Sequence, residues 1–239
     1  MRRFYAPVKS FSESAVTLDE DETRHLRDVL RLTSGDNVSV FDGEGHEFQC
    51  SISNIGKRSS ELEIIKKIEP AAPESFLQLS IVPTILNGEK YDLIVQKAVE
   101  LGVSSLTPLT TIRSEVKSRD ASKRLGRWRR IALEATKQCG RAKLMEIQEP
   151  IGFGEFIKKA NINELLMFSE RDGSGLATVT ASRRMTAIFG PKGGWDDVEL
   201  ETARKHGITI ATLGGRILRA ETAMIAISAI LQHRFGDIN

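Results

Sequence analysis

Two glycine-rich segments near the C-terminus limit most tightly what this chain can fold into. The first covers residues 190–194 (GPKGG) and follows the apolar run 185–189. The second begins at residues 213–215 (LGG), after the run 207–212, and leads into a helical pattern. Because glycine has no Cβ, its backbone N–H and C=O groups can approach a ligand closely. Two such turns, each between a strand and a helix, indicate one binding pocket at the C-terminal edge of a parallel sheet.

Strand and helix patterns alternate after residue 75, which predicts an α/β domain with a mostly parallel sheet. The expected strands cover residues 77–82, 105–109, 145–147, 165–168, 186–189 and 208–213. The expected helices cover residues 88–101, 121–139, 198–206 and 220–235. The helix at 198–206 has Asp196 or Asp197 as its N-cap, and Gly207 follows its end.

The first third of the chain has a different pattern, with short strands expected at residues 15–18, 37–41, 47–55 and 61–68. An acidic start at residue 19 opens one helix, which runs on to Leu30. Short strands joined by turns predict a small β-barrel. The stretch 69–75 contains Pro70 and Pro73 and breaks all periodicity, as a linker does. We therefore expect two domains, at residues 1–70 and 71–239.

The composition is that of an ordinary globular protein, with 40% hydrophobic and 28% charged residues among 239. No apolar run approaches the roughly 20 residues that a membrane span needs, and none follows Arg2 and Arg3 as in a secretory signal. Cys50 and Cys139 lie far apart and are typical of free thiols in a reducing cytoplasm. The cysteines and the four scattered histidines show no metal-binding spacing, so neither a metal nor a membrane is an expected partner.

The net charge is only +2, but the basic residues are unevenly distributed. Between Arg113 and Lys143 they greatly outnumber the acidic residues, which are Glu115, Asp120 and Glu134. The first third of the chain adds a second basic set, made of Arg2, Arg3, Arg24, Arg27 and Arg31. A solvated helix face explains either region alone, whereas the two together favour a nucleic-acid partner.

The glycine segment at 190–194 matches neither common phosphate-binding motif. A P-loop ends in Gly-Lys-Ser/Thr, whereas Lys192 precedes the paired glycines here. A dinucleotide fingerprint has Gly-x-Gly-x-x-Gly in the first βαβ unit. Pro191 removes a donor while Gly193 and Gly194 keep free N–H groups, which suits a flat ligand such as an adenine. Taken alone, the segment is a weak signal, and a plain strand-to-helix turn explains it better than a binding site.

A polar cluster marks the start of the last helix and consists of Arg216, Arg219, Glu221 and Thr222. A buried Arg/Glu set at a helix N-terminus is costly unless it is paired or functional. Arg219 and Glu221 therefore either fix the helix start by capping and ion pairing, or act in a site. Further along, the helix has more apolar surface than one contact needs, which is compatible with core packing or with a dimer.

Taken together and in this order, the two segments resemble the RsmE family, SPOUT-superfamily methyltransferases of bacterial small-subunit ribosomal RNA. The resemblance rests on residues 188–195 (IFGPKGGW) and 213–223 (LGGRILRAETA) and extends over the whole chain. Further matching segments are residues 2–5, 25–31, 97–103, 113–115 and 138–141, with Trp128 and Ala135. The chain departs from the family at Lys192, where glutamate is usual, and at Ile112, which replaces a common glutamate.

The resemblance implies an N-terminal PUA-like β-barrel for RNA and a C-terminal SPOUT-type α/β domain with a trefoil knot. It also implies a cytoplasmic homodimer that takes its methyl group from S-adenosylmethionine. The implied activity belongs to ribosomal RNA processing in ribosome biogenesis. It is the methylation of N3 of one uridine in 16S ribosomal RNA, free or within the 30S subunit.

The resemblance places the cofactor at the end of the strand 165–168 and in the two glycine segments. The residues expected to bind it are Phe168, Gly190, Pro191, Gly193, Gly194, Leu213, Gly214, Arg216, Ile217, Leu218, Glu221, Thr222 and Ala223. The basic residues expected to bind RNA are Arg2, Arg3, Arg24, Arg27, Arg31, Arg113 and Arg141.

Three residues are candidates for catalysis. Uracil N3 is a poor nucleophile until it loses its proton, and a guanidinium can stabilise the resulting anion. We expect Arg219 or Arg216 to do this, while Glu221 either orients an arginine or takes the proton. Two other classes stay open at this point. A non-catalytic RNA-binding protein would explain the charge but not the glycine segments, and an NAD-linked enzyme would lack its fingerprint.

Overall fold

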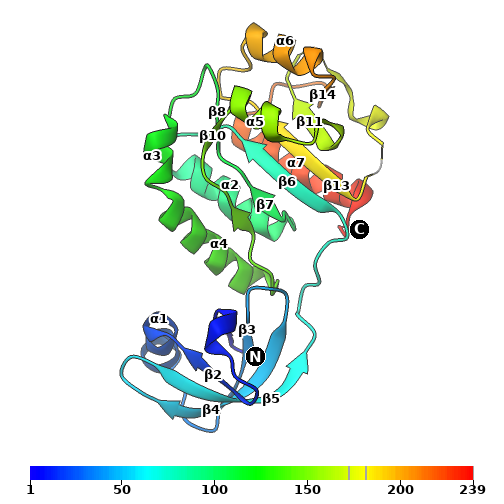
Figure 1. The fold of residues 1–239 in the computed structure, drawn as a ribbon. Coiled ribbons are helices and arrows are strands. Elements are labelled where there is room, and N and C mark those ends of the chain that lie inside the picture. The colour runs from blue at the N-terminus through cyan, green and yellow to red at the C-terminus, as the bar shows by residue number, and fades with distance from the viewer. Residues whose placement is uncertain (172, 181, 239) are drawn as a thin grey trace. The chain divides into compact units, whose positions relative to one another are not determined.

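The computed structural model describes residues 1–171, 173–180 and 182–238 and divides them into two compact units (Figure 1). Unit 1 consists of Met1–Glu74 together with Thr136–Leu144. Unit 2 consists of Ser75–Ala135 and the chain from Met145 onward. Unit 1 is therefore built from two separate stretches of the sequence. The boundary predicted near residue 70 marks only the first place where the chain passes between the units.

Unit 1 contains one sheet whose strands pair in the order β1-β3-β4-β5-β2. The strands are β1 (Arg3–Tyr5), β2 (Ala15–Leu18), β3 (Asn37–Phe41), β4 (Glu47–Ile55) and β5 (Ser60–Ile68). β1 runs parallel to β3, and the other neighbours are antiparallel. Alternate residues such as Val38, Val40 and Leu62 point into one apolar core. The short strands are confirmed, and closure of the sheet into a barrel stays a prediction.

The acidic start predicted at residue 19 does begin a helix. Asp19 caps α1 (Glu20–Arg24), because its carboxylate accepts the N–H of Glu22 at 2.9 Å. A wider, π-type turn, η2 (His25–Val29), continues the helix. Arg31 follows it with a positive φ of 54°, a conformation that a non-glycine residue rarely adopts and that ends the helix.

The returning segment Thr136–Leu144 is held in unit 1 by two arginines. The Arg3 guanidinium donates to the carbonyl oxygens of Thr136, Lys137 and Arg141 at 2.9–3.2 Å. It also forms an ion pair with the Glu47 carboxylate at 2.8 Å. Arg141 pairs with Glu74 at 2.6 Å and is only 4% exposed. Both arginines therefore serve the fold of unit 1, a role that the expectation of RNA binding did not include.

Unit 2 contains a parallel sheet with strand order β12-β14-β11-β13-β6-β7-β9. Its strands are β6 (Gln78–Pro83), β7 (Ser105–Leu106), β9 (Glu146–Ile147), β11 (Leu165–Phe168), β12 (Ser174–Gly175), β13 (Arg184–Phe189) and β14 (Thr209–Thr212). A separate parallel pair joins β8 (Leu109–Thr110) and β10 (Ile151–Gly152). The predicted parallel α/β sheet is confirmed.

Helices cover both faces of this sheet (Figure 1). They are α2 (Glu89–Glu100), α5 (Phe153–Lys159), α6 (Asp197–Lys205) and α7 (Ala220–Phe235). Two more helices, α3 (Ser118–Ser122) and α4 (Leu125–Cys139), lie in the connection between β8 and β9. The face toward α5 and α6 carries a row of Val82, Ile188, Met167 and Ile210 in register. On the other face, α7 lies against β6 and β13 and packs with α2. Among the described residues, no helix is long and apolar enough to cross a membrane.

Candidate functional site

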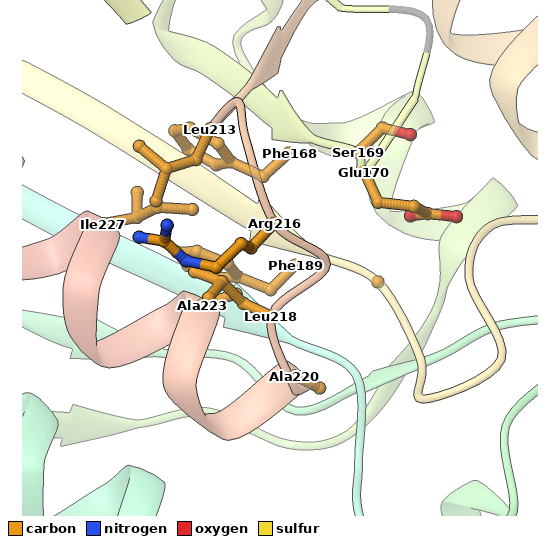
Figure 2. A pocket seen from close by; sticks show the side chains of 11 residues that line it. Phe168, Ser169, Glu170, Phe189, Leu213, Arg216, Leu218, Ala220, Ala223 and Ile227 are labelled. Atoms are coloured by element: carbon orange, nitrogen blue, oxygen red, sulfur yellow. The ribbon is translucent and has the colours of Figure 1, made fainter.

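The two glycine segments meet at one edge of the unit 2 sheet, as predicted. β14, β11 and β13 are neighbours, and they end at Thr212, Phe168 and Phe189. A pocket opens between these strand ends and the first turns of α7 (Figure 2). Its lining consists of Phe168, Ser169, Glu170, Phe189, Gly190, Leu213, Arg216, Leu218, Ala220, Ala223 and Ile227.

Two stacked aromatic rings form part of the wall. The Phe168 and Phe189 rings are nearly parallel, with centroids 5.4 Å apart, and both side chains are buried. Behind them, the indole N–H of Trp195 donates to the carbonyl oxygen of Phe168 at 2.7 Å. A Cβ on Gly190 would lie 2.8 Å from that indole nitrogen, so only glycine fits there. The ends of β11 and β13 therefore pack closely against Trp195 where they face the pocket.

Residues 191–194 form a tight turn, closed by a hydrogen bond from the N–H of Gly194 to the carbonyl oxygen of Pro191 at 3.0 Å. Gly194 has a φ of +72°, which disfavours any side chain. A Cβ at Gly194 would also lie 2.4 Å from the Glu170 carboxylate. The backbone conformation thus favours glycine at position 194 whatever occupies the pocket.

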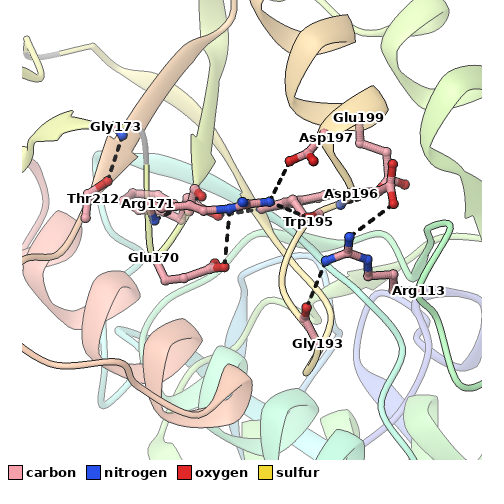
Figure 3. A network of polar contacts seen from close by, with 12 residues as sticks. Arg113, Glu170, Arg171, Gly173, Gly193, Trp195, Asp196, Asp197, Glu199 and Thr212 are labelled. Carbon is pink, nitrogen blue, oxygen red and sulfur yellow. Dashed lines mark hydrogen bonds and ion pairs between the residues drawn. The ribbon is translucent and has the colours of Figure 1, made fainter.

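A polar network holds this turn from the α6 side (Figure 3). Arg113 donates to the carbonyl oxygen of Gly193 and pairs with Asp196, both at 3.2 Å. Glu199 accepts the N–H groups of Ile112 and Asp196, at 2.9 and 3.2 Å, and completes a capping box with Asp196. Burial raises the pKa of Glu199 although these N–H donors lower it. Arg113 thus contacts the glycine turn while it stays exposed, and its predicted binding of RNA stays a prediction.

The loop after β11 is tied to the same region. Arg171 pairs with Asp197 at 2.8 Å and donates to the carbonyl oxygen of Trp195 at 3.2 Å. The N–H of Gly173 donates to the hydroxyl of Thr212 at 3.0 Å. Glu170 is held between these anchors and faces the pocket from the side opposite Arg216 (Figure 2).

Arg219 and Glu221, two of the polar residues predicted for the site, have different surroundings at the start of α7. Arg219 is the N-cap, but its side chain makes no capping hydrogen bond and is exposed. Glu221 pairs with Lys90 of α2 at 3.1 Å. Burial alone would raise the pKa of Glu221, but its own backbone N–H and Lys90 outweigh burial and lower it. The condition under which Glu221 would take a proton, a raised pKa, is not met.

The structure brings part of the predicted cofactor set into the pocket wall, namely Phe168, Gly190, Leu213, Arg216, Leu218 and Ala223. The others lie beside it in the same segments and are Pro191, Gly193, Gly194, Gly214, Ile217, Glu221 and Thr222. The wall also contains Ser169, Glu170, Phe189, Ala220 and Ile227, which were not among the residues expected to bind the cofactor. Glu170 could have been found from its position just after a strand that ends at the same sheet edge.

The remaining basic residues expected to bind RNA lie in unit 1. Arg24 pairs with Asp21 at 2.6 Å, and Arg27 pairs with Asp28 at 2.7 Å. Asp28 in turn has a lowered pKa because of its hydrogen bond from Arg27. Arg2 and Arg31 are exposed. Their availability to RNA stays a prediction.

Comparison with known proteins defines the class. The family model described as an RNA methyltransferase domain matches residues 73–232, and that of an RNA methyltransferase PUA domain matches residues 18–65. The fold and site are therefore those of an RNA methyltransferase with a PUA domain in its first third. More particularly, the chain belongs to the ribosomal RNA small subunit methyltransferase E family, which confirms the resemblance seen in the sequence.

Relatives and solved structures support this assignment. The family member from Mesomycoplasma hyopneumoniae is 31% identical over 94% of this chain and 96% of its own length. The structure of the Neisseria gonorrhoeae family member bound to S-adenosyl methionine is 34% identical, with a TM-score of 0.91 over 100% of both chains. A Legionella pneumophila methyltransferase in complex with the same cofactor is 30% identical, with a TM-score of 0.90 over 99% of this chain and 98% of that one.

Proposed function

We propose that this chain transfers a methyl group from S-adenosylmethionine to N3 of one uridine in the 16S ribosomal RNA of the small subunit. The observation that carries the proposal is the pocket where β11, β13 and β14 end beside the start of α7. Membership of the family supports the RNA substrate, and two similar structures that contain the cofactor support the methyl donor.

The residues of the pocket fit an adenosyl group. Phe168, Phe189 and Leu218 offer apolar surface, and the small side chains of Ala220 and Ala223 leave room. No heavy atom lies within 4 Å of where a Cβ would stand at residues 214 and 215, so the backbone there is open to hydrogen bonding. When bound, S-adenosylmethionine supplies a methyl group on a positively charged sulfur, which is a good leaving group.

Glu170 extends the predicted cofactor set. Glu170 is the acidic residue among those that line the pocket. An ionised carboxylate accepts hydrogen bonds from hydroxyl or ammonium groups. S-adenosylmethionine presents both kinds of donor, on its ribose and on its amino acid part. We infer that Glu170 binds one of them, while the backbone of residues 190–194 and 213–218 holds the adenine.

Arg219 and Arg216 are the residues that we expect to contact the uracil base. Both are exposed, and Arg216 lines the pocket. A guanidinium there would donate hydrogen bonds to uracil O2 or O4 as N3 loses its proton, and so stabilise the anion. The lowered pKa of Glu221 and its ion pair with Lys90 favour a positioning role for that carboxylate over proton removal. The target base must leave its stack to reach this pocket.

The proposal includes the assembly and the setting of the enzyme. We infer a cytoplasmic homodimer that acts on RNA within the 30S subunit, with a trefoil knot around the cofactor pocket. Ile225 and Ile230 of α7 are only half-buried in the single chain, which supports a second copy packing there. Sedimentation at micromolar concentration gives the mass of the assembly, and a monomer with full activity would contradict the dimer.

A substitution in α7 tests the pocket. Ala223→Leu extends an apolar side chain into it without a helix penalty, because leucine is a good helix former. Overpacking costs about 1–3 kcal/mol, so calorimetry should show S-adenosylmethionine binding weakened on the order of tenfold or more. Ala223→Ser, which adds one atom, is the matched control and should bind nearly as wild type.

The same pair of variants tests the reaction in cells. Mass spectrometry of 16S ribosomal RNA from a strain lacking the gene should show one N3-methyluridine missing. The wild-type gene and Ala223→Ser should restore it, and Ala223→Leu should not. Unchanged cofactor affinity in a folded Ala223→Leu protein, or no missing methyl group in the deletion strain, would overturn the proposal.

A further inference from the structure

The positively charged side chains around the pocket outnumber the negatively charged ones. Four ion pairs are formed there: Lys90 with Glu221 at 3.1 Å, Arg113 with Asp196 at 3.2 Å, and Arg171 with Asp197 at 2.8 Å and, more loosely, with Glu170 at 3.9 Å. In residues 169–171, 190–197 and 213–223, the charged side chains outside these pairs are Lys192, Arg216 and Arg219. Within the described part of the chain, the site therefore keeps an excess of positive charge beside the pocket.

Lys192 differs from the two arginines in position. It lies at the tip of the turn 191–194, outside the residues that line the pocket, and it is exposed. Among the described residues it has neither an ion pair nor a side-chain hydrogen bond, whereas the nearby Arg113 has both. A lysine ammonium with no protein partner can bind an external anion without first breaking an internal contact.

The turn that carries Lys192 is fixed by the protein. Its own hydrogen bond joins Gly194 to Pro191, and Arg113 holds the carbonyl oxygen of Gly193 from the side of α6 (Figure 3). Pro191 is buried, and Glu170 packs against Gly194. The base of the turn is thus held on both sides, and only the lysine side chain must be ordered on binding. Preorganisation of this kind lowers the entropic cost of binding.

We propose that Lys192 binds a phosphate of the substrate RNA next to the target uridine, while Arg216 and Arg219 face the base itself. The inference rests on the proposed function. A nucleotide whose base enters the pocket brings its flanking phosphates to the pocket mouth, where the turn lies. Phosphates position a nucleic acid on a protein without reading its sequence, and a lysine suits them as a point charge. The carboxylate of S-adenosylmethionine is the other anion in reach, and the experiment separates the two.

The experiment measures three quantities on Lys192→Ala and Lys192→Glu in the full chain. The first is binding to 30S subunits purified from a strain lacking the gene, followed across a series of salt concentrations. The second is calorimetric binding of S-adenosylmethionine alone. The third is turnover at saturating 30S. Lys158→Ala and Lys158→Glu on α5 are matched controls, because Lys158 is also exposed and has no ion pair among the described residues.

The expected result is specific to RNA. Lys192→Ala should weaken 30S binding about 3- to 10-fold and lower the slope of log K against log salt by about one, as for the loss of one phosphate contact. Lys192→Glu should weaken it further, and turnover at saturation should stay within about twofold. Cofactor affinity should be unchanged in both variants, and the Lys158 variants should match wild type.

Two results would overturn the inference. One is a salt slope and an affinity for 30S that stay at the wild-type value in both Lys192 variants. The other is a loss of S-adenosylmethionine affinity without a change in RNA binding, which would assign Lys192 to the cofactor carboxylate. Failure of the proposed function has a different signature, because the wild-type chain itself would then neither bind S-adenosylmethionine nor methylate 30S subunits. The salt series on RNA binding still tests Lys192 in that case.

Discussion

Arg219 is placed so that its removal should affect the reaction more than the fold. It is the N-cap of α7, yet its side chain makes no capping hydrogen bond, so Arg219→Ala should change the unfolding free energy by less than about 0.5 kcal/mol. If Arg219 stabilises the uracil anion, the same substitution should lower turnover on the order of 10²- to 10³-fold. Single-turnover methylation of 30S subunits, beside thermal unfolding, measures both quantities.

The lysine variant sharpens this test. Arg219→Lys keeps the charge but lacks the planar fork that can meet two acceptors, so it should recover little turnover. Cofactor affinity should stay near wild type in both variants, because Arg219 lies outside the pocket wall. Near-normal turnover in Arg219→Ala would remove this residue from the mechanism and leave Arg216 as the candidate.

Glu221 carries a prediction about pH. Its folded-state pKa is lowered from the ordinary value of 4.5, because its backbone N–H and Lys90 outweigh the opposing effect of burial. A lowered pKa stabilises the fold fully above the unfolded value and loses that effect as pH falls through the folded value. The unfolding free energy of wild type should therefore exceed that of Glu221→Gln most at neutral pH, and the gap should shrink below pH 4.5.

The activity of the same variant decides between the two roles of Glu221. A carboxylate that is ionised and paired at neutral pH adds no ascending limb near pH 7 to the rate profile. Glu221→Gln should thus keep the shape of the profile of turnover against pH, with Lys90→Met as the control for the broken ion pair. Loss of an ascending limb in Glu221→Gln alone would instead make Glu221 the proton acceptor.

At the scale of elements, the start of α6 supports the glycine turn. Glu199 is 4% exposed and accepts two backbone N–H groups, from Ile112 and Asp196. Glu199→Ala leaves both donors without this acceptor, which should lower the unfolding free energy by about 1–3 kcal/mol and weaken cofactor binding through the turn. Glu199→Gln keeps one acceptor oxygen, so its loss of unfolding free energy, measured by chemical denaturation, should be intermediate. Equal stability of the alanine variant and wild type would contradict this role.

The elements that the sequence predicted well are those with strong periodicity. Strands such as β11 and β14 and the helices α6 and α7 lie within a residue or two of their expected bounds. α5 was missed, because Phe153–Lys159 is short, has Gly154 in its first turn and follows the N-cap Gly152. Strand order was not predictable either, since β11 lies between β13 and β14 only through tertiary pairing. Glu170 was missed because its only signal is its position two residues after the end of β11, and that position gains meaning once the strand order is known.

At the scale of the whole molecule, the sequence did not indicate that unit 1 is formed by two separate stretches of the chain. Periodicity places Thr136–Cys139 in the long helix α4, and nothing local indicates that these residues and the following Gly140–Leu144 pack with the first third of the chain. The contacts that bind them are side-chain to backbone hydrogen bonds over long sequence distances, such as those from Arg3. A cut at the proline-rich stretch therefore divides unit 1.

The last prediction concerns a fragment that begins at residue 75. It keeps the pocket, so calorimetry should show S-adenosylmethionine binding close to that of the full chain. It lacks the partners of Thr136–Leu144, among them Arg3 and Glu74, so the amide hydrogens there should exchange much faster than in the full chain. Arg3→Ala in the full chain should speed exchange in that segment and leave α6 and α7 unaffected. Full protection of residues 136–144 in the fragment would show that this segment folds without unit 1 and would contradict the division of the chain described here.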